Sequence, residues 1–141
     1  MVGNNAISQK LKKQNKMKQL MILLFITLSF NTMAQKYALN AQHYIMADET
    51  GVIANKAVDI NMVVDLDKSR LVIYSKEIQV IDYEPIRNYV DEDNYSVIET
   101  TATDTNWKDI LLTFYVNTEN GIVIVRIIYP SYAYSYICRI L

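Results

Sequence analysis

The sequence predicts an all-β domain of about eight antiparallel strands, preceded by a signal-peptide helix. Three observations lead to this fold class. After Gln35, apolar residues recur at every second position, which is the period of a strand with one buried face. Turn-forming residues separate these runs at short intervals. No segment after Gln35 combines a helical period with helix caps, so the body of the chain is expected to contain strands alone.

The first predicted element is a signal peptide over residues 17–34. Lys16 and Lys18 precede an apolar run over residues 20–30, and a short small-residue segment then ends in Ala34. This order of positive, apolar and small residues is typical of a secretory leader. The apolar run is shorter than the roughly 20 residues of a membrane-spanning helix. We therefore favour cleavage after Ala34 over a buried or membrane-anchoring helix.

The leader divides the chain into three parts. Residues 1–16 form a polar extension unlike a normal leader, and a translation start at Met17 would explain it. No cysteine lies near the predicted cleavage point, which excludes acylation of a mature N-terminal cysteine. We expect an exported product of residues 35–141 that forms a single β domain in the periplasm or outside the cell.

The strands of this domain are predicted in order along the chain. In the clearest strand, Val58, Ile60 and Met62 alternate with polar residues, as a half-buried antiparallel strand requires. The other segments share this alternation or a β-branched and aromatic composition. The full set of predicted strands is residues 37–46, 57–66, 70–75, 78–83, 95–103, 110–116, 122–129 and 131–140.

Turn-forming residues mark the ends of the strands. Asp67-Lys68-Ser69 and Lys76-Glu77 are predicted turns, and Pro85 with the acidic residues 91–94 is expected to interrupt pairing. Asn120-Gly121 is the clearest hairpin signal, because this pair accepts positive φ. Short connections in sequence order favour a meander, closed as a small up-and-down barrel or folded as a two-layer sandwich. We favour the barrel because closure removes exposed edges.

Two short motifs lie within the segment Val58–Asp82. Asp65-Leu66-Asp67 forms an Asp-x-Asp turn after an apolar strand, and Ile73-Tyr74-Ser75 lies in the following strand. With the leader, this arrangement resembles a group of small exported bacterial proteins of unknown function. The resemblance covers about a quarter of the mature chain. It implies export and a β-rich fold, and it implies no particular activity.

Composition and charge exclude several classes of function. Of the 141 residues, 51% are hydrophobic and 21% are charged, which is sufficient for a packed core. From residue 35 onward, nine basic and fifteen acidic residues give a formal charge of −6 without a basic stripe. This charge argues against binding to nucleic acid or anionic lipid. One cysteine and one histidine exclude an internal disulfide and a Cys/His zinc site, and we expect no cofactor.

The sequence shows no catalytic set, and we expect a protein that is not an enzyme. His43 is the only histidine, and no nucleophile or orienting partner accompanies it in the sequence. Asp65 and Asp67, like residues 91–93, lack the glycine and distal glutamate of an EF-hand, so we interpret both clusters as solvated turns rather than metal sites. Cys138 is expected to be a buried, unreactive thiol.

Tyrosine is the most distinctive residue type, with eleven copies that all follow Gln35. Tyr132, Tyr134 and Tyr136 alternate, so their rings project from one face of the last strand. With Trp107 and Tyr115 nearby in the predicted sheet, these rings are the candidate ligand-binding residues, because phenol rings offer flat apolar area with a polar tip. The competing interpretation is cross-strand aromatic packing within the sheet.

These observations predict an exported, non-enzymatic β-domain of unknown specific role that binds a small apolar or glycan ligand through an aromatic face. The alternative is a structural, protein-interaction or inhibitor module that acts through a sheet edge or through the acidic loop Asp91–Asn94. Neither hypothesis places a membrane span in the mature chain, and both leave the oligomeric state open. Whether the face of Tyr132, Tyr134 and Tyr136 points into a cavity, a filled core or solvent distinguishes the two.

Overall fold

The computed structural model describes residues 35–86 and 89–141. The predicted signal peptide and the polar extension before it lie outside the described residues. Within the described residues, no helix is long and apolar enough to cross a membrane. The described part of the chain is all-β, as predicted, and its strands belong to one antiparallel sheet.

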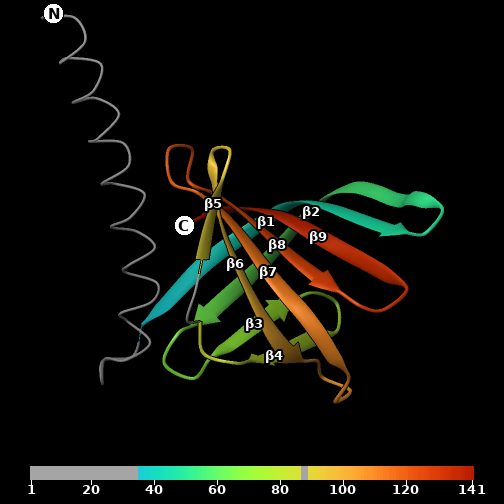
Figure 1. The fold of residues 1–141 in the computed structure, drawn as a ribbon, viewed down its shortest axis with the longest axis horizontal. Coiled ribbons are helices and arrows are strands. Elements are labelled where there is room, and N and C mark those ends of the chain that lie inside the picture. Colours follow the sequence, from blue (N-terminus) through green and yellow to red (C-terminus); the bar gives the residue numbers. More distant parts are fainter. Residues whose placement is uncertain (1–34, 87–88) are drawn as a thin grey trace, which may run out of the picture.

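The sheet contains nine strands among the described residues, drawn in Figure 1. They are β1 (Lys36–Asp48), β2 (Gly51–Asp65), β3 (Arg70–Tyr74), β4 (Ile78–Tyr83), β5 (Tyr89–Glu92), β6 (Tyr95–Thr103), β7 (Asp109–Asn117), β8 (Ile122–Ile128) and β9 (Tyr132–Ile140). Their order in the sheet is β4-β3-β2-β1-β9-β8-β7-β6-β5, and β4 also pairs with β6. This last pairing closes eight of the strands into a barrel, so the barrel rather than the two-layer sandwich is the observed fold.

Two contacts between distant parts of the chain close the barrel. The first strand pairs with the last over a long register, from Leu39 opposite Ile140 to Asp48 opposite Tyr132. The β4–β6 contact is much shorter and contains only two residue pairs, of which Tyr83 opposite Ala102 is one. The barrel therefore has one extended closure, between β1 and β9, and one short seam.

The structure corrects the prediction that the acidic segment before Tyr95 interrupts pairing. Residues 89–92 form the short strand β5, and Asp91 and Glu92 pair with β6 inside this hairpin. Only Asp93 and Asn94 turn the chain, and Asp93 adopts a positive φ of 54°. Aspartate tolerates this conformation better than most residues, which explains why an acidic run can hold a tight hairpin. β5 pairs only with β6 and is not part of the closed barrel.

The first hairpin is also longer than predicted. β1 and β2 continue to a turn at Glu49-Thr50, whereas the sequence predicted strands that end at residue 46 and begin again at residue 57. Gly51 supports this turn with a φ of +119°, a conformation that residues with a side chain rarely adopt.

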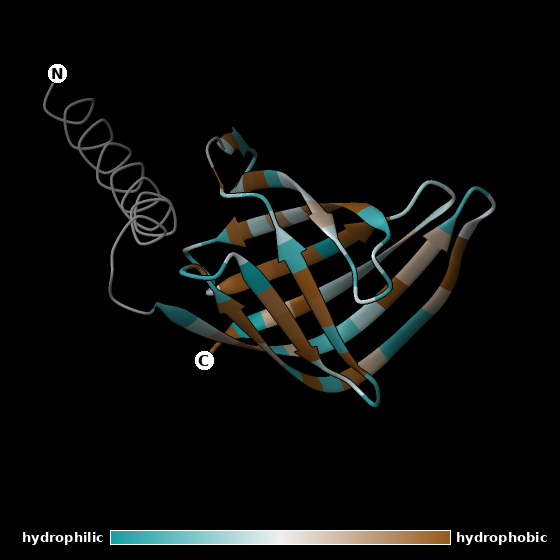
Figure 2. Ribbon diagram, turned by 90° about the horizontal axis from the view of Figure 1, so that it is seen from below, coloured by the Kyte–Doolittle hydropathy of each residue, from teal (hydrophilic) through white to brown (hydrophobic). Residues whose placement is uncertain are grey.

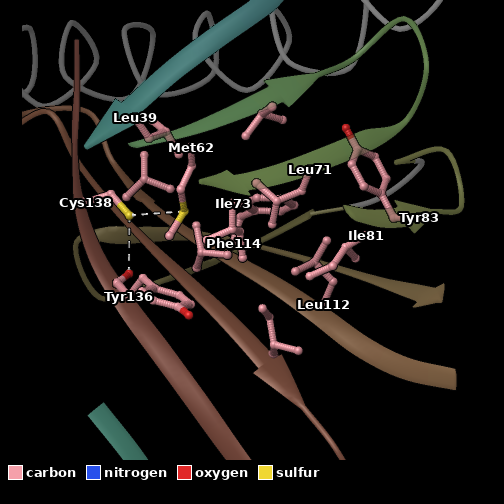
Figure 3. Packing of buried hydrophobic residues seen from close by; sticks show 14 of the residues in the cluster. Leu39, Met62, Leu71, Ile73, Ile81, Tyr83, Leu112, Phe114, Tyr136 and Cys138 are labelled. Atoms are coloured by element: carbon pink, nitrogen blue, oxygen red, sulfur yellow. Dashed lines mark hydrogen bonds between the residues drawn. The ribbon is translucent and has the colours of Figure 1, made fainter. Parts of the chain in front are cut away.

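Alternate side chains of the strands fill the interior of the barrel (Figure 3), and the alternation is visible as brown and teal bands along the strands in Figure 2. On β7, Ile110, Leu112, Phe114 and Val116 are buried, as the sequence pattern predicted. The largest fully buried side chains are Phe114, Leu39, Met62, Leu66, Leu71, Ile73, Ile81, Ile98, Leu112, Ile127 and Val64. The barrel axis is therefore packed with side chains and forms a core.

A β-bulge in the first strand changes which of its residues face this interior. Leu39 and Ala41 are buried, but the register shifts between Ala41 and His43 against both neighbouring strands. Beyond the shift, Tyr44 lies opposite the buried Tyr136. Successive strand residues point to opposite faces, so one extra residue reverses the set that points inward. The bulge thus turns Tyr44 inward and His43 outward.

The packed interior predicts a large cost for removing core volume. Leu112→Ala should lower the free energy of unfolding by about 2–5 kcal/mol, because Leu112 is fully buried and the methyl groups it loses leave a cavity. Val90→Ala is the control: Val90 is 66% exposed, and its replacement should change stability by no more than about 0.5 kcal/mol. Urea denaturation followed by circular dichroism measures both values. Equal effects of the two substitutions would contradict the packed barrel.

Candidate functional site

The candidate site is a cleft of about 580 Å³ at one end of the barrel, named here the tyrosine cleft. It lies between the β3–β4 turn, the β6–β7 loop and the inner face of β1 and β9. Its lining residues are Tyr44, Ser75, Lys76, Glu77, Ile78, Gln79, Asp104, Thr105, Asn106, Tyr129, Tyr134 and Tyr136.

Unequal strand lengths produce the cleft. β1 and β2 contain 13 and 15 residues, whereas β3 and β4 contain only 5 and 6. β3 pairs with β2 only over Asn61–Asp65, so residues 51–60 continue beyond the end of β3. The barrel wall is therefore low on the β3–β4 side, and the inner face of β1 and β9 remains uncovered there. Tyr44 and Tyr134 lie on this uncovered face.

Tyr134 occupies the centre of a cluster of five tyrosine rings. Its ring centroid lies 6.1 Å from that of Tyr44, 5.8 Å from Tyr129, 6.3 Å from Tyr132 and 6.0 Å from Tyr136. The rings of Tyr129, Tyr132 and Tyr134 are nearly parallel, with interplanar angles of 13° to 29°, whereas Tyr136 meets Tyr134 edge-on at 87°. Tilted and offset arrangements of this kind are favourable for aromatic pairs.

The β8–β9 turn holds two of these rings against each other. Tyr129 donates its backbone N–H to the carbonyl oxygen of Tyr132 at 2.8 Å, and Pro130 follows Tyr129 inside the turn. Proline at this position favours a tight turn because its φ is fixed. The turn brings the two rings into a stack with centroids 4.7 Å apart.

Asp104 fixes the β6–β7 loop to this cluster. The hydroxyl of Tyr129 donates to Asp104 Oδ2 at 2.7 Å, and the backbone N–H groups of Asn106 and Lys108 donate to Oδ1 at 2.9 and 2.8 Å. Burial raises the pKa of Asp104, but these hydrogen bonds favour its charged form, and the pKa lies below the usual value. Asp104 is therefore an ionised carboxylate with both oxygens already engaged.

The polar contacts across the cleft are longer. The hydroxyl of Tyr134 donates to Gln79 Oε1 at 3.4 Å and lies 3.4 Å from the hydroxyl of Tyr129. Gln79 Nε2 donates to Ser75 Oγ, also at 3.4 Å. These distances are beyond the usual range of strong hydrogen bonds. The 3.4 Å contacts of Tyr134 are thus weaker than the Tyr129–Asp104 hydrogen bond, and Gln79 also forms a hydrogen bond with the side chain of Tyr136.

The tyrosine hydroxyls of the cleft are neutral at physiological pH. Burial raises the pKa of Tyr136 to about 12 and also raises the pKa values of Tyr44, Tyr129 and Tyr134. A phenol removed from water is harder to ionise because the charged form loses its hydration. The cleft consequently presents protonated hydroxyls that can donate as well as accept hydrogen bonds.

The structure brings together three of the five predicted site residues. Tyr132, Tyr134 and Tyr136 all belong to the cluster, although Tyr136 is buried beside the core and Tyr132 borders a smaller neighbouring hollow with Met46 and Ile53. Tyr136 therefore packs against the core, as the competing interpretation expects, and Tyr134 and Tyr136 both line the cleft. Ligand binding by these rings stays a prediction.

Trp107 and Tyr115 do not join the cluster. Trp107 is 87% exposed in the β6–β7 loop, with a positive φ of 64°. Tyr115 lies on the outer face of β7, because the residues on either side of it face the core, and it packs edge-on against Tyr95 at 6.5 Å. Neither ring lies in the cleft, although both belong to the neighbouring part of the chain. Tyr115 points to the opposite face of the sheet because successive residues of a strand alternate between its two faces.

Among the cleft residues that were not predicted from the sequence are Tyr44, Gln79, Asp104 and Tyr129. Tyr129, just before Pro130, is a further tyrosine close in sequence to Tyr132, Tyr134 and Tyr136, and this clustering could have been used. Tyr44 reaches the cleft only because of the bulge, which the sequence pattern does not reveal. Gln79 and Asp104 arrive there through barrel closure.

His43 lies outside the cleft. Its Nε2 atom forms a hydrogen bond with Asn55 Oδ1 across the first hairpin. It lies opposite Ile137, whose neighbours Tyr136 and Cys138 are buried, so the imidazole is on the outer face of the barrel. No hydroxyl or thiol nucleophile is recorded in contact with it among the described residues.

The prediction that Cys138 is buried is confirmed. Its side chain is 1% exposed, with Sγ 3.9 Å from Met62 Sδ and 3.6 Å from the carbonyl oxygen of Tyr136 (Figure 3). Burial raises the pKa of this thiol to about 12. The thiolate that reacts with electrophiles is thus scarce at neutral pH.

The acidic turns differ from the prediction at one residue. Asp65 is 6% exposed rather than solvated, and its Oδ1 accepts the backbone N–H of Lys68 at 3.1 Å, which caps the β2–β3 turn. Asp67 and residues 91–93 are exposed, as predicted. Within the described ranges, no group of three or more histidine, cysteine or carboxylate side chains is arranged to hold a metal ion.

A second hollow of about 550 Å³ borders β4, β6 and β7. Asp82, Glu84 and Asp109 contribute carboxylates to its lining, whereas Tyr129 is the only aromatic residue there. Asp82 is engaged by Arg70 Nε at 2.6 Å. With a single aromatic ring and three carboxylates in its lining, this hollow is a weaker candidate than the tyrosine cleft.

Comparisons with known proteins found no family model, no curated protein and no solved structure that matches the chain. The resemblance of Val58–Asp82 to small exported bacterial proteins stays a prediction. The function must therefore be argued from the cleft itself.

The environment of Cys138 predicts a protected thiol. At pH 8, iodoacetamide should modify the folded protein very slowly and the urea-unfolded protein rapidly, because folding both buries Sγ and suppresses its ionisation. Intact-mass measurements over time follow the reaction. Rapid modification of the folded protein would contradict the burial of this strand.

The tyrosine cluster predicts a loss of stability at alkaline pH. In the folded protein Tyr136 keeps its proton up to a pKa of about 12, whereas in the unfolded chain its pKa is near the ordinary value of 10. Deprotonation therefore favours unfolding. The contribution of Tyr136 to the free energy of unfolding is complete below pH 10 and should be lost as the pH rises to about 12. Urea denaturation at pH steps measures this decline.

Tyr136→Phe should decline less steeply than the unmodified protein over the same pH range, because it lacks the ionising group. Tyr115→Phe on the outer face is the matched control. Parallel declines of the unmodified protein and Tyr136→Phe would show that Tyr136 does not carry the effect.

Proposed function

We propose that the mature domain is an exported, non-enzymatic binding module that holds a small ligand in the tyrosine cleft. The observation that carries this proposal is the cleft of about 580 Å³ lined by four tyrosine side chains. Its size falls within the range of roughly 300–1,000 Å³ that is common for small-molecule sites. Rings with a few convergent polar groups are also the usual composition of such sites.

The packing of the rings supports a preformed site. Tyr134 contacts four other rings, and the cluster is anchored by the 2.7 Å hydrogen bond from Tyr129 to Asp104. Side chains that are already ordered lose little conformational freedom when a ligand binds, so more of the contact energy contributes to affinity. Tyrosine suits this role because it has few rotatable bonds and a large contact area.

The alternative function, interaction through a sheet edge, has two candidate surfaces among the described residues. One is the outer edge of β5, which pairs only with β6, and the other is residues 51–60 of β2. Residues 51–60 of β2 pair with β1 on one side and with no other described strand on the other. Lys56 and Asp59 are exposed along this segment, and the register shifts twice within the hairpin. Charged residues and bulges are the features by which proteins prevent an edge from pairing with a foreign strand. The cleft is therefore the better-supported site.

Replacing the central ring tests the proposed site. The purified protein is titrated with 4-nitrophenyl β-D-glucoside, which combines an aryl group and a sugar, and with N-phenyl-1-naphthylamine, a neutral apolar probe. Tyr134→Ala should weaken the binding of any probe that occupies the cleft by about tenfold or more, because it removes the central contact surface. Isothermal titration or fluorescence measures the dissociation constants.

Tyr115→Ala is the matched control, since it removes the same side chain from the outer face. Circular dichroism establishes that both variants fold. If neither probe binds, or if Tyr134→Ala and Tyr115→Ala bind equally well, the cleft is not the binding site.

A further inference from the structure

We infer that the ligand of the tyrosine cleft is a neutral saccharide. This inference rests on the proposed function and adds the chemical class of the ligand to it. Four features of the cleft lead to this class: its charge, its weakly satisfied polar groups, the cost of burying those groups under an apolar ligand, and the arrangement of its rings.

The charges around the cleft disfavour an ionic ligand of either sign. Asp104 is ionised but engaged on both oxygens, and Glu77 adds a second carboxylate to the lining, so an anion would meet repulsion. A cation would compete with a cation that the protein already supplies, because Lys56 Nζ lies 5.6 Å from the ring centroid of Tyr44. Lys76 also lies in the lining. A neutral molecule avoids both penalties.

The polar groups of the cleft favour a ligand with hydroxyl groups. Two hydrogen bonds of 3.4 Å cross the cleft. The hydroxyl of Tyr134 donates to Gln79 Oε1, and Gln79 Nε2 donates to Ser75 Oγ. Ser75 Oγ already donates to the carbonyl oxygen of Glu77 at 2.6 Å. The 3.4 Å bonds of Tyr134 and Gln79 contribute less than bonds near 2.9 Å, so these two side chains have more to gain from a better partner. A hydroxyl group of a ligand can both donate and accept a hydrogen bond. It therefore suits the phenol of Tyr134 and the amide of Gln79, which can also do both.

The same polar groups disfavour a purely apolar ligand. Such a ligand would expel water from Gln79 and the hydroxyl of Tyr134 and would offer no hydrogen bond in return. Burying an unsatisfied amide or hydroxyl costs free energy that apolar contact must first recover. A saccharide replaces the expelled water with its own hydroxyls.

The rings provide the complementary apolar surface. Tyr129, Tyr132 and Tyr134 are nearly parallel, with the polar ends of Tyr129 and Tyr134 meeting at 3.4 Å. A pyranose ring has one or both faces covered by C–H groups and a rim of hydroxyls. It can therefore place its C–H face against a phenol ring while its rim reaches the hydroxyls and amide at the ring ends.

A neutral glycan array followed by titration tests this inference on the purified protein. At least one neutral oligosaccharide should bind, and two conservative variants should weaken it about fivefold to tenfold: Tyr134→Phe, which keeps the ring and removes its hydroxyl, and Gln79→Leu, which keeps the volume and removes the amide. N-phenyl-1-naphthylamine, measured in parallel, should not lose affinity in either variant. Tyr115→Phe is the control and should leave saccharide binding unchanged.

Each outcome distinguishes the inference from the proposed function. Saccharide binding that both conservative variants weaken supports both. If N-phenyl-1-naphthylamine binds and Tyr134→Ala abolishes this binding, while no neutral oligosaccharide on the array binds, the saccharide inference is wrong and the binding function stands. If no probe of either kind binds, both are overturned. Saccharide binding that neither Tyr134→Phe nor Gln79→Leu changes would place the sugar elsewhere and overturn the inference.

Discussion

Pairing of the first strand with the last is the interaction on which the rest of the structure depends. β1 lies between β2 and β9, and among the strands that the structure describes it alone joins the N-terminal half of the barrel to the C-terminal half over a long register. The opposite seam, between β4 and β6, contains only two residue pairs. Because the β1–β9 pairing is antiparallel and long, it determines which side chains of the two halves share the interior. Tyr44 and Tyr136 meet for this reason.

The barrel combines a closed core with an open end because its strands differ in length. Where all strands overlap, alternate apolar side chains such as Leu39, Ile73 and Phe114 fill the interior. Where β3 and β4 end, the inward positions of β1 and β9 continue without a facing wall. Leucine or isoleucine at these positions would be exposed to water. Tyrosine is suited to them because its ring covers the core and its hydroxyl remains near solvent.

The regular part of the fold could be predicted from the sequence, because it follows from local patterns. Alternation of apolar residues located the strand from Ile110 to Val116 correctly, and Asn120-Gly121 marked a true hairpin turn. The predicted strand over residues 57–66 matches only the second half of β2, which begins at Gly51 and ends at Asp65. The irregular part could not be predicted. An acidic run before Tyr95 gives no sign that two of its residues belong to a strand, and β5 was missed because it has only four residues, of which the last two are acidic and exposed.

The candidate site shows the same division. Tyr132, Tyr134 and Tyr136 share a strand face, and strand geometry alone places them together. Tyr44 reaches them through a register shift at Ala41–His43, and such a shift depends on pairing with two other strands rather than on local sequence. Packing and ligand contact are consequently not exclusive roles for this cluster. The rings that support one another are also the rings that leave a cleft between them, and the mutual packing is what would hold the binding surface in place before a ligand arrives.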